Sequence, residues 1–397
     1  MSTGYAQYLS MQKKTVSRKL IRIFFLLLLV TITQLGYAQD SSRIRISLLT
    51  CSPGDELYSI FGHSAIRVID SNSVTDYVFN YGTFDFNDEG FYLKFMRGKL
   101  RYFVSIENSV DFINNYAFEG REIIEQVIQL SSDEKINIKN SLIENLKEEN
   151  KYYKYDFFYD NCTSRLRDII VKSKQPLPIL PAAMPIKTTF RDAIHTYLEN
   201  GHQYWSELGI DLLLGARTDK VMTATEQCFL PDNLKKSLEY SKNPSIIESS
   251  SVIISKAPKA ENQSWLNPLF LFISFAFIYL FFSFLKNPMM NKILTSLDQL
   301  LFFTSGILGF LLLVMWTMTD HSMTKNNYNL LWAIPTNIIF CFFISRSNPI
   351  IKKYFKMQSI VLFLLLCAWA FIPQKLNNSL VPVVILLTIR SYRIGIK

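Results

Sequence analysis

The C-terminal third of the chain consists of long apolar runs, whereas the part before it alternates between short apolar and polar stretches. Five apolar runs occupy residues 268–285, 299–318, 329–344, 359–371 and 380–389. A helix needs ~20 apolar residues to cross a bilayer. The pattern therefore predicts a helical transmembrane domain of five spans over residues 266–397, in which the last two runs are short for a complete crossing.

The region before these runs begins with period-two alternation, typical of β-strands, and continues with helical periodicity. Strand character is found at residues 43–50, 63–70, 75–86, 98–106 and 122–130, and helical segments follow from residue 131 onward. This order predicts an α+β domain over residues 39–240, with an antiparallel sheet first and helices after it. Residues 241–265 are polar and weakly periodic, so we expect a linker there.

Charges around the apolar segments predict how the chain is oriented. Several basic residues precede a short apolar run at 23–33, and Gly36 and Ala38 supply the small residues of a cleavage site. We therefore expect a signal peptide over residues 1–38. The loops after the first, third and fifth apolar runs carry most of the nearby Lys and Arg, and the positive-inside rule then places the α+β domain outside the cytoplasm.

The composition agrees with an exported domain followed by a transmembrane domain. Of the 397 residues, 49% are hydrophobic and 19% are charged, which is typical of a chain that lies partly in lipid. The net charge of +9 falls largely in the loops that the positive-inside rule places in the cytoplasm. It therefore gives no reason to expect binding to nucleic acid.

Three of the five cysteines lie in the exported region, so at least one of Cys51, Cys162 and Cys228 must be unpaired. Cys162 stands in the polar stretch DNCTS at the start of a predicted helix. Free N–H groups and the helix macrodipole lower the pKa of a thiol at that position. Cys162 is therefore a candidate nucleophile; the alternatives are a buried apolar thiol or a disulfide with Cys51 or Cys228.

A thiol nucleophile needs a base, and the exported region holds three histidines. His63 follows Gly62 and begins a predicted strand, which would hold its imidazole in one place. Asn80 lies on the next predicted strand and is placed to orient it. His195 and His202 lie in or just after a helix with a polar surface, so we expect solvated roles for both.

Other kinds of site have weaker support in the sequence. The chain has no C-x-x-C or H-x-x-x-H spacing for zinc, no Gly-rich phosphate loop and no G-x-S-x-G elbow. We therefore expect neither a metal nor a cofactor.

Three stretches resemble the blocks of the Lnb-type exported domain of bacterial envelope proteins: GDELYSIFGHSAIRV, YVFNYGTFDFNDEGFYLKFMRGKLRYFVS and YDFFYDNCTSRLRD. Five spans after such a domain match the Lnb-like membrane domain. The exported domain of that family is similar to permuted papain-like folds, in which the strand with the histidine precedes the helix with the cysteine. His63 and Cys162 occur in that order.

The resemblance implies lipoprotein N-acylation, the transfer of an acyl chain from a phospholipid to the α-amino group of a diacylated lipoprotein's N-terminal cysteine. It implies a place in the bacterial inner membrane, with the catalytic domain on the periplasmic side. Cys162 would be the nucleophile, His63 the base and, by analogy, Asn80 the orienting residue. The oxyanion that forms during acyl transfer would be stabilised by the backbone N–H of Cys162, together with a donor from Asn161 or Tyr159.

Asp320 and His321 lie in the first outward loop of the membrane domain. They are either part of a solvated loop or groups that orient a lipid headgroup or the incoming amine. Two other functions also remain open. A membrane-anchored papain-like peptidase or amidase would act on cell-wall peptides, and a non-catalytic envelope scaffold would use Cys162 structurally.

Overall fold

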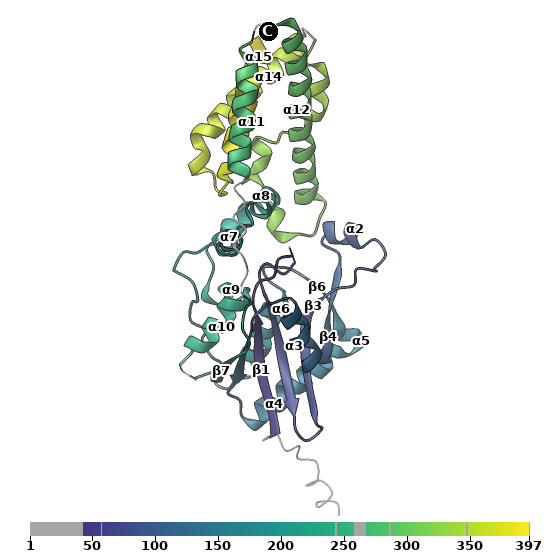
Figure 1. Cartoon of the computed structure of the whole chain (residues 1–397), viewed down its shortest axis with the longest axis vertical. Coiled ribbons are helices and arrows are strands. Elements are labelled where there is room, and N and C mark those ends of the chain that lie inside the picture. The colour runs from purple at the N-terminus through teal and green to yellow at the C-terminus, as the bar shows by residue number, and fades with distance from the viewer. Residues whose placement is uncertain are drawn as a thin grey trace, which may run out of the picture.

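The computed structural model describes residues 43–56, 58–242, 244–257, 267–285, 287–346 and 348–396. The expected signal peptide at 1–38 lies outside the described residues. Figure 1 shows a sheet domain and a bundle of helices stacked along the long axis of the molecule, with α7 (Phe190–Asn200) and α8 (Tyr204–Leu213) between them.

The sheet has seven strands in the order β6-β4-β3-β2-β1-β5-β7, and every neighbouring pair is antiparallel. Its strands are β1 (Ile44–Cys51), β2 (His63–Asp70), β3 (Thr75–Thr83), β4 (Arg101–Asn108), β5 (Ile123–Ile128), β6 (Tyr152–Lys154) and β7 (Ile247–Ile254). The expected antiparallel sheet in the first half of the chain is therefore confirmed.

The strand β7 corrects part of the expectation of a linker over 241–265, of which residues 258–265 lie outside the described residues. It pairs with β5 from Ile123 to Ile128 and forms one edge of the sheet. Ser249, Ser250 and Ser251 are exposed in this strand, so it lacks the apolar alternation by which a strand is recognised. Backbone pairing holds β7 in place, together with the partly buried Ile247, Ile253 and Ile254 at its ends.

Helices cover both faces of the sheet. The covering helices are α3 (Ser109–Phe118), α4 (Ser132–Leu146), α6 (Cys162–Ser173) and α10 (Pro231–Tyr240). The shorter α5 (Glu148–Lys151) follows α4, and α9 (Ala224–Gln227) precedes α10. The short α2 (Phe91–Met96) lies beyond the sheet, near the end of α12 (Pro288–Thr317; Figure 1). On one face Leu142 of α4, Leu166 of α6 and Leu234 of α10 join the strand residue Ile66 in the main core. On the other face Phe112 of α3 packs in a second cluster. The cysteine helix is thus fixed against β2.

The membrane domain contains three helices long and apolar enough to span a bilayer among the described residues, at Pro288–Thr317, Pro349–Phe371 and Asn378–Ile396. Within them lie α12 (Pro288–Thr317), α14 (Pro349–Ala368) and α15 (Val381–Ile396), and the shorter apolar helix α11 (Pro268–Ser283) precedes them. Five full spans, as expected from the apolar runs, are therefore not found in the described part of the chain.

The apolar run at 329–344 accounts for much of this difference. It forms two 3-10 turns (Tyr328–Leu331 and Cys341–Phe343) around the short α13 (Asn337–Phe340) rather than one helix. Pro335 lies between the turns and cannot donate the backbone hydrogen bond that a continuous helix needs. The segment instead packs closely on α12, where a side chain at Gly309 would collide with the Ala333 carbonyl.

Polar contacts join the two domains at α8 and the segment after it. Asn327 Nδ2 donates to the Leu212 carbonyl at 2.7 Å, and Gln374 Nε2 donates to the Leu214 carbonyl at 2.9 Å. Asn377 Nδ2 donates to Asp211 Oδ2 at 2.9 Å, and Asp211 in turn pairs with the fully buried Arg191. These bonds fix the sheet domain to the outward loops of the membrane domain.

Candidate active site

His63 is the first residue of β2, and the backbone before it has an unusual conformation. Gly62 has φ +78°, and a Cβ there would lie 2.7 Å from the Cys51 carbonyl oxygen. Only glycine accepts this φ and this contact without strain. His63 then pairs in register with Cys51 of β1, which holds its backbone at the start of β2. The expected rigid strand position of His63 is confirmed.

Cys162 is the first residue of α6, as the sequence predicted. The preceding Asn161 caps the helix: its Oδ1 accepts from the Ser164 backbone N–H at 2.8 Å, and its own N–H donates to Ser164 Oγ at 2.8 Å. This reciprocal cap fixes the first turn. The thiol therefore lies at the positive end of the helix macrodipole.

Asn80 of β3 lies beside the imidazole, as expected. Its Oδ1 is 3.2 Å from His63 Nε2, and its Nδ2 donates to Glu107 Oε1 at 2.6 Å. Because Glu107 accepts from the amide nitrogen, the amide oxygen faces His63 and accepts a hydrogen bond from its Nε2–H. The other ring nitrogen, Nδ1, is then left to accept a proton.

The ionisation of the pair is coupled. Burial raises the pKa of the Cys162 thiol, but the charge and hydrogen bond of His63 and the Ser64 backbone N–H outweigh it, lowering that pKa from 9.0 to about 7. Burial likewise lowers the pKa of His63, yet the interactions with Cys162 and Asn80 raise it overall. The two groups therefore stabilise each other as a thiolate and an imidazolium.

The pair opens onto a cavity of about 870 Å³. The cavity lies between the sheet domain and the loop that follows α12. Aromatic side chains supply much of its lining: Tyr58, Phe61, Tyr81, Phe84, Phe86, Phe91, Tyr92, Phe95, Tyr102, Tyr116, Tyr155, Phe157, Phe158 and Phe229. A cavity of this size with a few polar groups and a reactive pair at its wall suits a largely apolar ligand.

The two side chains expected to help stabilise an oxyanion do not reach it. Asn161 Nδ2 donates to the carbonyls of Phe157 at 2.7 Å and Phe229 at 2.8 Å, so its amide protons are already used. Tyr159 is 45% exposed, packs against Phe190 and does not line the cavity. Neither side chain therefore offers a free donor to the cavity, because carbonyl contacts and surface packing determine where the two groups point.

The structure adds residues that the sequence did not single out. Glu107 of β4 anchors Asn80, and its placement depends on strand pairing that a motif does not reveal. Tyr155 lines the cavity, stacks on Tyr102 with ring centroids 4.3 Å apart, and lies beside Gly82 under Cys162. The aromatic run 155–159 before the cysteine was the available signal for Tyr155.

Arg121 lines the same cavity and is almost fully buried. Its Nε donates to the Ser52 carbonyl at 2.8 Å, and its Nη1 pairs with Glu119 at 2.9 Å. Its Nη2 has no hydrogen-bond partner within the described residues. The guanidinium also acts against protonation of His63, since its charge lowers the pKa of that residue.

Asp320 and His321 reach the cavity from the membrane domain, but their polar atoms are engaged with the sheet domain. Asp320 pairs with Lys154 at 3.0 Å, and His321 Nε2 lies 3.0 Å from the Phe95 carbonyl oxygen. Both residues line the cavity. The two side chains thus bridge the domains at the wall of the site.

The remaining cysteines do not pair with Cys162. All five cysteines of the chain fall within the described residues, and each is a free thiol. Cys51 and Cys228 are buried, and burial raises the pKa of Cys51 to about 12. Of the three thiols that precede the membrane helices, Cys162 is therefore the one suited to react.

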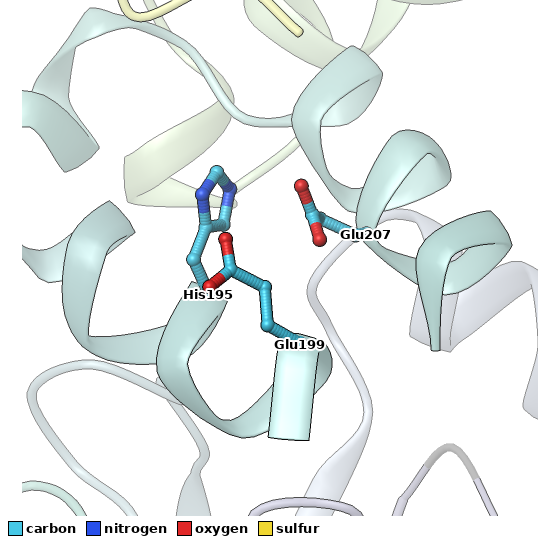
Figure 2. A group of neighbouring side chains, drawn as sticks. All are labelled: His195, Glu199 and Glu207. Carbon is cyan, nitrogen blue, oxygen red and sulfur yellow. The ribbon is translucent and has the colours of Figure 1, made fainter. Parts of the chain in front are cut away.

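A second cluster surrounds His195, which corrects the expectation of a solvated role. His195 is buried, and its Nε2 lies 2.9 Å from Asp211 Oδ1 at the domain junction. Figure 2 shows Glu199 and Glu207 beside its ring, and one ligand atom from each of the three residues lies within 4.8 Å of the others. The group has the donors of a metal site, but Glu199 is exposed and His195 already binds Asp211, so we assign it to the junction.

Comparison with known proteins gives two family matches. Residues 37–195 match the model of the Lnb N-terminal periplasmic domain, and residues 260–397 match that of the Lnb transmembrane domain. No curated protein and no solved structure matches the chain. The two models cover the cysteine, the histidine and the membrane helices in the family's order. The chain therefore belongs to the Lnb family of membrane proteins with a periplasmic N-terminal domain.

Proposed function

We propose that the protein is a lipoprotein N-acyltransferase of the bacterial inner membrane, which carries the acyl chain as a thioester on Cys162. The acyl donor is a membrane phospholipid, and the acceptor is the α-amino group of a diacylated lipoprotein's N-terminal cysteine. The observation that carries the proposal is the coupled pair of Cys162 and His63 on an aromatic cavity that a membrane-domain loop helps to form.

The first half of the reaction forms the acyl-enzyme. His63 Nδ1 takes the proton of the Cys162 thiol, and Sγ attacks the carbonyl carbon of the phospholipid ester. The backbone N–H of Cys162, at the start of α6, donates a hydrogen bond to the resulting oxyanion. When the C–O bond breaks, the leaving alkoxide takes the proton from His63. The products are a thioester and a lysophospholipid.

The second half transfers the acyl chain to nitrogen. The neutral α-amine attacks the thioester carbonyl, and His63 accepts the proton that the amine loses. The C–S bond then breaks, which leaves an amide on the lipoprotein and a thiolate on the enzyme. A thioester suits this step because an amine attacks it more readily than an oxygen ester at neutral pH.

One feature supports acyl transfer over peptide hydrolysis, and another argues against a non-catalytic scaffold. The cavity wall is aromatic, which suits acyl chains better than the polar backbone of a cell-wall peptide. The free thiol argues against a structural disulfide in a scaffold protein. We further propose a permuted papain-like arrangement for the sheet domain, since the histidine strand precedes the cysteine helix.

Purified enzyme in vesicles with acyl-labelled phospholipid and a diacylated lipopeptide provides the test. We expect label on the lipopeptide amine and, without acceptor, a Cys162 adduct that hydroxylamine releases. Cys162→Ser should abolish the amide product, and His63→Ala should slow both steps. Formation of the amide at the wild-type rate by Cys162→Ser would refute the mechanism.

A further inference from the structure

One surface outside the catalytic pair combines exposed apolar side chains with basic ones. We call it the α2 ridge, and it consists of Phe86, Tyr92, Leu93, Phe95 and Met96. Tyr92 is 76% exposed, Phe86 63% and Leu93 56%. Clustered apolar groups on a water-soluble surface are uncommon and mark an interaction site.

The ridge is attached to the membrane domain where a span ends. The Asp320 backbone N–H donates to the Arg97 carbonyl at 3.0 Å, and His321 Nε2 lies 3.0 Å from the Phe95 carbonyl oxygen. Both loop residues come shortly after α12, which ends at Thr317. Figure 1 accordingly shows α2 beside the end of α12 that faces the sheet domain. The ridge therefore lies beside the end of the longest membrane-domain helix that faces the sheet domain.

Charge around the ridge suits the surface of a phospholipid bilayer. Arg97 and Lys99 directly follow α2, and Lys94 lies within it. Lys94 pairs with Asp88, whereas Arg97 is exposed in the turn beyond the helix. Aromatic residues flanked by Lys and Arg are typical of segments at a membrane interface. The basic groups complement lipid phosphates.

The same segment forms part of the cavity wall. Phe91, Tyr92 and Phe95 line the cavity, and Phe91 is buried against Phe84 with ring centroids 5.8 Å apart. Leu93 and Met96 are exposed and do not line it. One side of α2 thus faces the reactive pair's cavity, and the other side faces outward.

We propose that the α2 ridge is buried in the outer leaflet of the membrane that the protein spans, and that a lipid acyl chain enters the cavity past it. Burial of the ridge is independent of the enzyme's activity. The entry route rests on the proposed acyltransferase function. A second copy of the chain or a soluble partner protein would be the other possible occupants, and the test below distinguishes them.

The full-length protein in phospholipid vesicles tests the burial directly. An environment-sensitive fluorophore is attached at Leu93→Cys in a Cys162→Ser, Cys367→Ser background, and spin-labelled lipids act as quenchers. The matched control is Ser73→Cys in the exposed turn between β2 and β3, at the opposite end of the sheet from His63. We expect a blue-shifted and lipid-quenched signal at position 93 and neither effect at position 73.

Equal quenching at the two positions would overturn the proposal. So would a blue shift at position 93 that lipids do not quench and that disappears on dilution, since that result identifies a second copy or another protein as the occupant. Because this measurement needs no turnover, it decides the location of the ridge even if the proposed activity is wrong.

The entry route is tested with Leu93→Asp, which changes no residue of the catalytic pair or the cavity lining. The substitution removes one leucine side chain from the lipid. Because the ridge then binds the leaflet less tightly, we expect acyl transfer from vesicle phospholipid to be about 10-fold slower. The rate with a water-soluble short-chain ester, and the alkylation rate of Cys162, should not change. Equal rates of wild type and Leu93→Asp on vesicle phospholipid would refute the entry route.

Discussion

Thr163 Oγ1 donates a buried hydrogen bond to Ser64 Oγ at 3.0 Å, and these two residues directly follow Cys162 and His63 in the chain. The bond joins the first turn of α6 to the start of β2. It therefore helps to hold together two elements that carry the reactive pair and that are separated along the chain by the four strands β3 to β6. This contact between neighbouring side chains adds to the direct interaction of Cys162 with His63 in holding the two elements together.

Thr163→Val tests this relationship with little change in volume. It leaves the Ser64 hydroxyl buried without its donor, so we expect the free energy of unfolding to fall by about 1–2 kcal/mol. Alkylation of Cys162 at pH 7 should also slow, because α6 is no longer held against β2. Thr163→Ser keeps the hydroxyl and serves as the control. Identical unfolding and alkylation for the Val and Ser variants would contradict the role of the bond.

The pH dependence of Cys162 alkylation should report the coupled pair. Only the thiolate reacts, and His63 lowers the pKa of the thiol to about 7, so the rate should rise through that pH. In His63→Ala the burial remains while the stabilising charge is lost. The midpoint should then move to higher pH, beyond the usual value of a thiol. Peptide mapping by mass spectrometry separates Cys162 from the exposed Cys367.

Asn80 should act by orienting the imidazole rather than by contacting substrate. Asn80→Ala removes the acceptor for Nε2, and we expect acyl transfer to slow by about 100-fold, in line with a lost general-base contribution. Glu107→Gln keeps an oxygen that accepts from Asn80 Nδ2, whereas Glu107→Leu does not. The Leu variant should therefore resemble Asn80→Ala, and the Gln variant should remain close to wild type. Equal acyl-transfer rates for Glu107→Gln and Glu107→Leu would argue against the series of hydrogen bonds from Glu107 through Asn80 to His63.

Gly62 should be intolerant of any side chain. Gly62→Ala places a Cβ 2.7 Å from the Cys51 carbonyl oxygen at φ +78°, and we expect a loss of about 2 kcal/mol in the free energy of unfolding. Gly209→Ala in α8 is the matched control, because no atom lies within 4 Å of its Cβ position. That change should raise stability by about 0.5–1 kcal/mol. Thermal unfolding in detergent compares the two.

The sequence predicted the elements whose signal is local. Period-two alternation located β1 to β5, and the polar stretch before Cys162 located the start of α6. Together they brought His63, Asn80 and Cys162 into one site, because adjacent antiparallel strands have few possible arrangements. Whether those residues perform acyl transfer is a separate prediction that the proposed experiments address.

Features that depend on distant partners were not predictable in this way. His321 meets the Phe95 carbonyl across 226 positions of sequence, and no local pattern encodes that contact. Asn161 carries the donors that an oxyanion site needs, yet nearby carbonyls accept both of its amide protons. The run at 329–344 has the apolarity of a span, but Pro335 and the close approach to Gly309 shape it differently.

The position of β7 has a consequence for how the protein is made. This strand closes the sheet next to β5 and is the last strand before α11, the first helix of the membrane domain. A nascent chain exported from its N-terminus completes the periplasmic sheet only when residues up to Ile254 have crossed, just before the first apolar helix arrives. A truncated protein that ends before Ile247 would expose β5 as an open edge, which invites aggregation. The sheet is thus complete only when nearly all of the chain before the membrane helices is present.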